Sequence, residues 1–276
     1  KWHIWFCQRH KPTHREPKEP FSQHNLFAFN FYNGNNMNNL TISPFHGETP
    51  ENFDTRCLCV LVLDTSYSMN GDPIGELNKG LVGFGDFLKS KNSTRFSVEV
   101  SIITFNSTVE CVQEPALVDN MKATEKFPLK ATGSTKLVDG VRAAIKKVED
   151  RKQWYRSNGI GFFRPWIVLM TDGYPDPDQD VEGLANEIKI GHQGRHFAFL
   201  PMGVQGSDPN FLKKISTPEF PPLPIDWKKF EAVFRWLSNS LDKVSQSTEG
   251  EAVTFDSVHD FARTGWGGGD FTQTAI

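Results

Sequence analysis

Apolar residues follow two alternating patterns along the chain, short continuous runs and longer stretches at helical spacing. The run at 57–63 (CLCVLVL) is typical of a β-strand buried on both faces of a sheet. Further apolar runs predict strands at 96–105, 108–112, 166–170 and 196–202. The polar pair Asn106-Ser107 lies between two of them and also suits a bulged hairpin at a sheet edge.

Helices are predicted between these strands. Asp72-Pro73 offers an N-cap followed by proline at the first helical position. After it, apolar residues recur at helical spacing, at Ile74, Leu77, Leu81, Phe84 and Leu88. Other helices are predicted from near Ser134-Thr135, over 181–190, and through a final stretch with Phe230, Val233, Phe234, Leu237, Leu241 and Val244 on one face.

The regular succession of strand and helix implies right-handed crossovers. We therefore predict an α/β fold: a doubly wound, mostly parallel central sheet with one antiparallel edge strand and helices on both faces. In such a sheet the binding crevice lies beyond the carboxyl ends of the strands.

The ends of the chain lack this regularity. Residues 1–36 show neither a period of two nor one of 3.6, so we interpret them as an irregular segment, of upstream or non-native origin. His3, Cys7, His10 and His14 have spacings that a zinc site could use, but the missing Cys-x-x-Cys pair favours an irregular tail. The predicted organisation is a lead-in at 37–56, a domain at 57–246 and a C-terminal tail at 247–276.

Composition restricts the class of protein. The 276 residues are 38% hydrophobic, which is enough for a buried core, and carry a net charge of -3. Bulk charge therefore suggests neither nucleic acid nor an anionic membrane as partner. Cys57 and Cys59 alternate within the apolar run, as thiols rather than a disulfide framework. No apolar stretch approaches the roughly 20 residues that span a bilayer. We predict a cytoplasmic location.

Hard oxygen ligands occur in three loops, at 64–68 (DTSYS), 132–135 (TGST) and 171–173 (TDG). Alternate residues of an extended loop turn to the same side, so Asp64, Ser66 and Ser68 can converge on one point. Thr135 and Asp172 can reach that point from neighbouring strand ends. Two carboxylates and three hydroxyls favour Mg2+, or Mn2+, over the crowded carboxylate cage of Ca2+.

These three motifs, in this order, resemble the metal-ion-dependent adhesion site of von Willebrand factor A domains, and the resemblance covers residues 56–246. Within that family the chain looks most like the bacterial TerY-type branch, which is linked to tellurium resistance and stress responses. The segments that carry this likeness are VLDTSYSMNGDPIGELNKGL, SIITFNS, ATGSTKL, IVLMTDGYPDPD and WKKFEAVFRWLSNSL.

The resemblance implies a role for each ligand residue. Ser66, Ser68 and Thr135 would bind the metal directly or through water. Asp64 and Asp172 would accept hydrogen bonds from metal-bound waters. The sixth coordination position would stay open for an Asp or Glu carboxylate of a protein partner. The expected function is therefore a metal-dependent protein-interaction module without enzymatic activity.

Two tyrosines are predicted to contact the partner. Tyr67 stands where the TerY-type branch commonly has a small residue, and its ring lies beside the expected metal. Tyr174 directly follows the third motif. Both would influence access to the open coordination position.

Other functions remain as alternatives. One is a Mg2+-dependent phosphatase or phosphotransferase with Asp64 as nucleophile. Haloacid dehalogenase-like enzymes have a second aspartate two residues on, where this chain has Ser66, and the chain contains no Gly-x-Ser-x-Gly. Another alternative is a structural domain of this family whose metal is dispensable.

Two further features have ordinary interpretations. The acids at 176, 178 and 180 are interpreted as a solvated loop before a helix N-terminus rather than a second metal site. The glycines at 267–269 lack the Lys-Ser/Thr of a phosphate loop.

Overall fold

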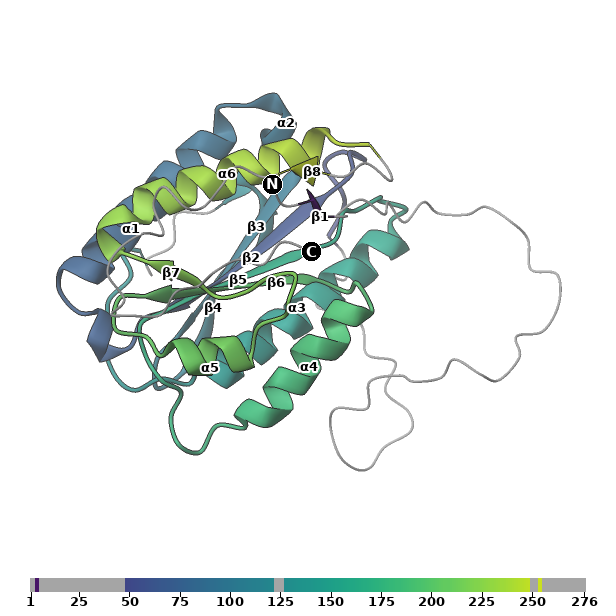
Figure 1. Ribbon diagram of the computed structural model, residues 1–276. Coiled ribbons are helices and arrows are strands. Elements are labelled where there is room, and N and C mark those ends of the chain that lie inside the picture. The colour runs from purple at the N-terminus through teal and green to yellow at the C-terminus, as the bar shows by residue number, and fades with distance from the viewer. Residues whose placement is uncertain (1–2, 5–47, 122–126, 249–252, 255–276) are drawn as a thin grey trace, which may run out of the picture.

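The structure, a computed structural model, describes residues 3–4, 48–121, 127–248 and 253–254 (Figure 1). The segment at 1–36, the tail at 247–276 and the glycine run lie almost entirely outside the described residues. Of the four residues considered for zinc, only His3 is inside them. No helix within the described part of the chain is long and apolar enough to cross a membrane.

A six-stranded sheet forms the centre, in the order β4-β3-β2-β5-β6-β7. Every neighbouring pair is parallel except β3 and β4. The predicted fold, with one antiparallel edge strand, is therefore confirmed. The strands are β2 (Cys57–Asp64), β3 (Val98–Phe105), β4 (Val109–Leu117), β5 (Trp166–Thr171), β6 (Ala198–Val204) and β7 (Leu223–Ile225). Separately, β1 (His3–Ile4) pairs with β8 (Val253–Thr254).

Helices cover both faces of the sheet (Figure 1). On one face lie α1 (Asp72–Lys89) and α6 (Phe230–Gln246), which belong to one hydrophobic cluster. On the other lie α3 (Leu137–Ser157), α4 (Val181–Gln193) and α5 (Pro209–Lys214), in a second cluster. The short α2 (Asn92–Arg95) precedes β3. The central strand β2 is buried along its whole length because both faces are covered.

Some boundaries differ from the sequence-based expectations. Helix α3 begins at Leu137 rather than near Ser134-Thr135, because those two residues are held by contacts outside the helix. Helix α1 has Gly71 as its N-cap, so Asp72 is its first residue. Helix α5 and strand β7 were not predicted, since six and three residues are too few to show a period.

Helices α1 and α6 approach each other at a glycine. A Cβ atom on Gly80 would lie 2.6 Å from Cδ2 of Phe234. The same phenylalanine ring packs on Phe84, with centroids 5.4 Å apart. Gly80 is therefore needed for close packing and not for an unusual backbone conformation.

We expect Gly80→Ala to lower the free energy of unfolding by about 1–3 kcal/mol, because the added methyl overpacks a filled interface. The matched control is Gly83→Ala in the same helix, where an added Cβ meets nothing within 4 Å. That change should raise stability by about 0.5–1 kcal/mol, since alanine is the better helix former. Urea denaturation of both variants measures the difference. Equal effects would contradict this account of the interface.

Candidate metal site

The carboxyl ends of β2 and β5 lie side by side, because the two central strands are parallel and paired in register from Cys59 to Leu63. Asp64 is therefore adjacent to Thr171, whose Oγ1 donates to Asp64 Oδ2 at 2.5 Å. Both side chains are buried. The innermost part of the site is thus a carboxylate fixed between two strand ends.

The first loop turns sharply after Asp64. The backbone N–H of Ser66 donates to Asp64 Oδ1 at 2.8 Å, and a 3-10 helix follows at Tyr67–Met69. This turn places the hydroxyls of Ser66 and Ser68 3.0 Å apart. The predicted convergence of the two serines is present, although it is produced by a helical turn and not by an extended loop.

The third loop joins the first through a direct hydrogen bond. Ser68 Oγ donates to Asp172 Oδ1 at 2.7 Å. Ser66, Ser68 and Asp172 therefore form one continuous chain of oxygen atoms across the sheet end. In this arrangement the oxygen atoms are hydrogen-bond partners of one another.

Thr135 approaches the same group from the second loop. A Cβ built on Gly173 would lie 3.5 Å from Thr135 Oγ1 and 3.7 Å from Asp64 Oδ2. Both oxygens therefore border the space beside the Gly173 backbone. A side chain at residue 173 would fill this space, so the absence of one leaves room for a small ligand. The structure thus brings together four predicted ligand residues by hydrogen bonds or strand pairing, and Thr135 by proximity.

The second loop is held in place by two contacts that the sequence did not reveal. Asp176 accepts hydrogen bonds from the backbone N–H of Thr135 at 3.0 Å and from Ser134 Oγ at 2.8 Å. Gly133 has a φ of 76°, and a Cβ there would clash with Ser107 Oγ. Asp176 is therefore a positioning residue of this loop rather than part of a solvated stretch.

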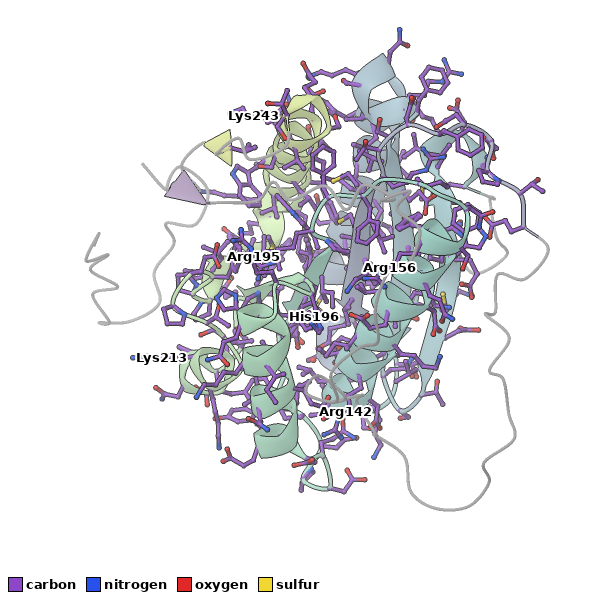
Figure 2. The ribbon with its side chains drawn as sticks, turned by 90° about the vertical axis from the view of Figure 1, so that its right-hand side faces the viewer. Arg142, Arg156, Arg195, His196, Lys213 and Lys243 are labelled. Atoms are coloured by element: carbon purple, nitrogen blue, oxygen red, sulfur yellow. The ribbon has the colours of Figure 1, made fainter. Side chains whose placement is uncertain are left out.

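The loop after the third motif is anchored to α3 by ion pairs. Lys136 Nζ lies 2.6 Å from Asp178 Oδ2. Arg142 of α3, labelled in Figure 2, contacts Oδ2 of Asp180, the N-cap of α4, and Oε1 of Glu187 in α4, at 2.8 Å each. Asp180 also caps α4 by accepting from the backbone N–H of Gly183, as the interpretation of a helix N-terminus expected.

The two carboxylates at the sheet end have perturbed pKa values. Burial raises the pKa of Asp64 to about 6, and the charge of Asp172 adds to this, while hydrogen bonds from Ser66 and Thr171 oppose it. Burial likewise raises the pKa of Asp172, against the hydrogen bond from Ser68. The raised pKa values mean that both acids resist ionisation. A cation bound beside them would stabilise their charged forms.

The donor set fits a hard cation. The described residues contain no group of three or more His, Cys, Asp or Glu side chains placed to hold a metal. The candidate site instead combines two carboxylates with three hydroxyls, which are oxygen ligands of the kind that Mg2+ and Mn2+ accept. The residues present are therefore compatible with one of these ions, with water completing the coordination.

The site opens to the surface beside two aromatic side chains. Tyr67 is 68% exposed and Tyr174 is 61% exposed, whereas Asp64 is fully buried. The ring centroid of Tyr174 lies 5.8 Å from that of Phe211, a buried residue of α5. Tyr67 and Tyr174 thus present exposed rings directly beside the first and third loops of the site, and their contact with a partner stays a prediction.

Comparisons with known proteins agree with the fold. A family model described as von Willebrand factor type A domain matches residues 59–234. The pilus adhesin SpaC from Lactobacillus rhamnosus GG, in an open conformation, is 15% identical, with a TM-score of 0.56, over 69% of this chain and 30% of that chain. A von Willebrand factor type A protein from Catenulispora acidiphila is 15% identical, with a TM-score of 0.51, over 68% of this chain and 43% of that chain.

A third solved structure is proximal thread matrix protein 1 from the mussel byssus with a zinc-occupied MIDAS motif. It is 15% identical, with a TM-score of 0.48, over 68% of this chain and 48% of that chain. The match spans less than half of each of these three solved chains. No curated protein matches the sequence. At 15% identity the likeness to the SpaC adhesin and to the Catenulispora acidiphila protein shows the fold alone.

Proposed function

Because the chain belongs to the von Willebrand factor type A domain family, whose model covers residues 59–234, we propose that it is a metal-dependent protein-interaction module. The observation that carries this proposal is the joining of Ser66, Ser68 and Asp172 into one group of oxygen atoms at the sheet end. Asp64 lies behind this group and Thr135 beside it.

In the proposed site Ser66, Ser68 and Thr135 would hold Mg2+ or Mn2+, and Asp64 and Asp172 would accept hydrogen bonds from water bound to the ion. When bound, the ion would provide a positive charge that attracts an acidic group of the partner. The side chains of the site determine how much negative charge surrounds the ion and whether a partner can reach it. Asp64 is buried and so supplies negative charge without blocking the opening, and the hydroxyls carry no charge. The ion therefore keeps its attraction for an added carboxylate.

The partner we propose is a protein that presents an Asp or Glu beside an apolar or aromatic contact. Tyr67 and Tyr174 offer such contacts at the entrance, because their rings are large and exposed. A role in a bacterial stress response of the tellurium-resistance type, in the cytoplasm, is supported only by the sequence resemblance to the TerY-type branch. Both remain predictions, as does the absence of nucleic-acid and membrane partners.

The enzymatic alternative is less favourable at this site. A nucleophilic Asp64 would have to reach a substrate phosphorus atom, yet its side chain is fully buried and both oxygens accept hydrogen bonds. Its position suits an acid that orients metal-bound water. A test for phosphatase activity with and without Mg2+, repeated on Asp64→Asn, separates the two functions.

We expect Ser66→Ala and Thr135→Ala each to weaken Mg2+ binding at least tenfold, because each removes one hydroxyl ligand that water replaces without the same preorganisation. Isothermal titration with Mg2+, Mn2+ and Zn2+ measures the affinities and the ion preference. The control is Ser90→Ala, which removes an exposed hydroxyl at the far end of α1. Unchanged Mg2+ affinity in both site variants would contradict the proposed ligand set.

The same variants test the partner interaction. The immobilised chain should retain an acidic partner in Mg2+ and release it in EDTA, and Thr135→Ala should weaken retention while leaving the fold intact. Exchange of the partner's contacting Asp or Glu for Asn or Gln should have a similar effect, since an uncharged amide is a poorer ligand for a hard ion. Retention that persists in EDTA and in the site variants would place recognition on another surface.

A further inference from the structure

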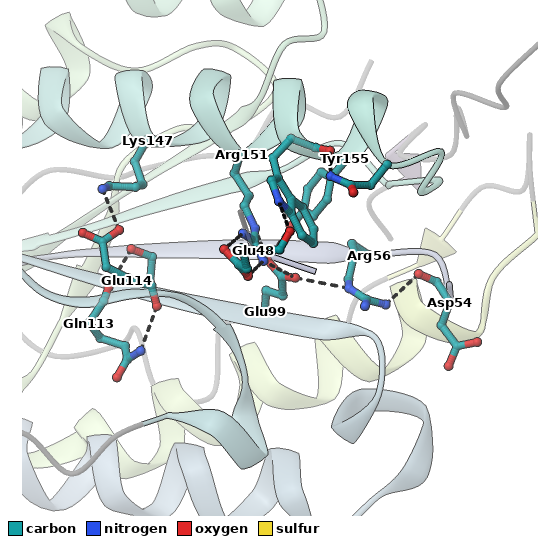
Figure 3. Close-up of polar contacts among 12 residues, drawn as sticks. Glu48, Asp54, Arg56, Glu99, Gln113, Glu114, Lys147, Arg151 and Tyr155 are labelled. Carbon is teal, nitrogen blue, oxygen red and sulfur yellow. Dashed lines mark hydrogen bonds and ion pairs between the residues drawn. The ribbon is translucent and has the colours of Figure 1, made fainter. Parts of the chain in front are cut away.

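A second cluster of charged side chains lies at the opposite end of the sheet, where the parallel strands begin (Figure 3). Glu99, near the start of β3, is buried and accepts a hydrogen bond from Tyr155 at 2.7 Å. It also binds the guanidinium of Arg56 at 3.2 Å and that of Arg151 at 2.7 and 2.9 Å. One buried carboxylate thus forms ion pairs with two buried guanidinium groups.

The charges of this cluster do not balance without another acid. Two guanidinium groups and one carboxylate leave one positive charge in the interior, where an unpaired charge is costly. Burial opposes the charged form of Arg151, but the hydrogen bonds and charge of Glu99, followed by Glu48, raise the pKa of its guanidinium. The cluster therefore requires a second carboxylate close to Arg151.

Glu48 supplies this carboxylate, and both its side chain and its backbone accept hydrogen bonds from α3. Its two oxygens accept hydrogen bonds from the two terminal nitrogens of Arg151 at 2.8 and 3.0 Å. Its backbone carbonyl accepts from Trp154 Nε1 at 3.2 Å. Bidentate pairing with arginine is a specific way to recognise a carboxylate. Glu48 is nevertheless 42% exposed, whereas Glu99 and Arg151 are each 2% exposed, so Glu48 is the replaceable member.

The cluster borders a pocket of about 780 Å³, and one polar side chain in its lining provides a second observation. Gln113 of β4 lines this pocket and is 6% exposed. Its Nε2 donates to the carbonyl of Glu114 at 2.8 Å, while its Oε1 has no hydrogen-bond partner among the residues that the structure describes. A buried acceptor without a donor destabilises the folded protein. An N–H group from a ligand would remove this cost.

We propose that this pocket is a binding site for an acidic peptide segment, and that Glu48 occupies its carboxylate position until such a segment replaces it. The glutamate side chain of the peptide pairs with Arg151, and a peptide N–H donates to Gln113 Oε1. A carboxylate suits the site because it carries the same single negative charge as the Glu48 side chain that it replaces. A phosphate dianion would bring an excess of negative charge into a site that already contains Glu99.

The pocket is separate from the candidate metal site. Arg56 immediately precedes β2 and Asp64 ends it, so the two sites lie at opposite ends of the same strand. Eight residues of strand extend over about 23 Å. Binding of peptide in the pocket is therefore expected to be independent of divalent metal, and failure at one site leaves the other proposal intact.

The experiment removes the Glu48 carboxylate by mutation and provides a carboxylate on an added peptide. In Glu48→Gln, a capped peptide with the sequence of residues 47–52 (GETPEN) should bind at least tenfold more tightly than in the unchanged chain, where Glu48 competes. The peptide with glutamine at its first glutamate should bind at least tenfold more weakly than the original. The matched peptide with glutamine at its second glutamate should bind as well as the original. EDTA should leave all of these affinities unchanged.

Thermal unfolding gives a second measurement that remains usable if Glu48→Gln is only marginally folded. Millimolar peptide should raise the melting temperature of Glu48→Gln and have a smaller effect on the control Glu231→Gln, which alters an exposed acid of α6 that pairs with Arg235 and does not line the pocket. Gln113→Met in the Glu48→Gln background should weaken peptide binding without lowering stability. The proposal is overturned by the absence of any peptide effect on Glu48→Gln, or by equal effects of the glutamate and glutamine peptides.

Discussion

Asp64→Asn should make the metal-free protein more stable at pH 7.5 by about 3 kcal/mol and at the same time abolish its stabilisation by Mg2+. The pKa of Asp64 is raised from 3.8 to about 6 by burial, so in the folded protein ionisation is unfavourable. A shift of this size corresponds to about 3 kcal/mol. Asparagine has a similar shape and keeps an acceptor for the backbone N–H of Ser66, but it carries no charge.

The dependence on pH has a defined sign. Between pH 3.8 and about 6 the folded protein retains the Asp64 proton that the unfolded chain has lost. The free energy of unfolding in EDTA should therefore fall as pH rises through this range, and Asp64→Asn should lack this contribution. Saturating Mg2+, at 100 times its dissociation constant, should stabilise the unchanged chain by about 2.7 kcal/mol and have no effect on the variant.

Urea denaturation at several pH values, with Mg2+ and with EDTA, measures both effects. Asp178→Asn is the matched control, since this exposed aspartate pairs with Lys136 close to the site but is not a proposed ligand. It should respond to Mg2+ like the unchanged chain. A Mg2+ response that survives in Asp64→Asn would show that the ion binds elsewhere or without this acid.

Glu99→Gln should lower the free energy of unfolding by about 3–5 kcal/mol, the largest loss that we expect from a single isosteric change in this chain. The glutamine side chain has the same size but cannot neutralise Arg56 and Arg151, which are buried beside it. The hydrogen bond from Tyr155 would also lose its charged acceptor. The two guanidinium groups would then remain in the interior with one half-exposed carboxylate, Glu48.

The control for this change is Glu114→Gln on the neighbouring strand. Glu114 is exposed and pairs with Lys147 at 2.7 Å, so its loss should cost no more than about 1 kcal/mol. Chemical denaturation of the two variants, with the slope of the transition compared as well as its midpoint, provides the measurement. Similar losses in both would contradict the importance assigned to the buried cluster.

The fold could be predicted because its main elements have clear periodic signals. The strand β2 is one uninterrupted apolar run, and α1 shows five apolar residues at helical spacing. The proximity of Asp64 and Asp172 could be predicted because one ends β2 and the other directly follows β5, and the topology of a parallel sheet brings such strand ends together. Thr135 follows no strand directly, since β4 ends at Leu117. For Asp64 and Thr171, which are 107 residues apart, the pairing of β2 with β5 was sufficient.

Other features had no signal in a single sequence. Glu99 is 43 residues from Arg56 and 52 from Arg151, and nothing in the sequence of β3 (VEVSIITF) indicates which cations this glutamate meets. Asp176 was interpreted as a solvated loop residue, since its contact with Thr135 depends on how two loops fold against each other. Such polar contacts are set by tertiary structure, whereas burial is already indicated by the apolar pattern.

The position of β2 has a mechanical consequence. This strand carries the metal loop at one end and Arg56 at the other, and β3 and β5 flank it in parallel orientation. Tension between a partner at the metal and the chain preceding Arg56 would act along the strand axis, across the hydrogen bonds on both sides. Those bonds would share the load in shear and would have to break together rather than one after another. The central strand is thus oriented to resist pulling along its length.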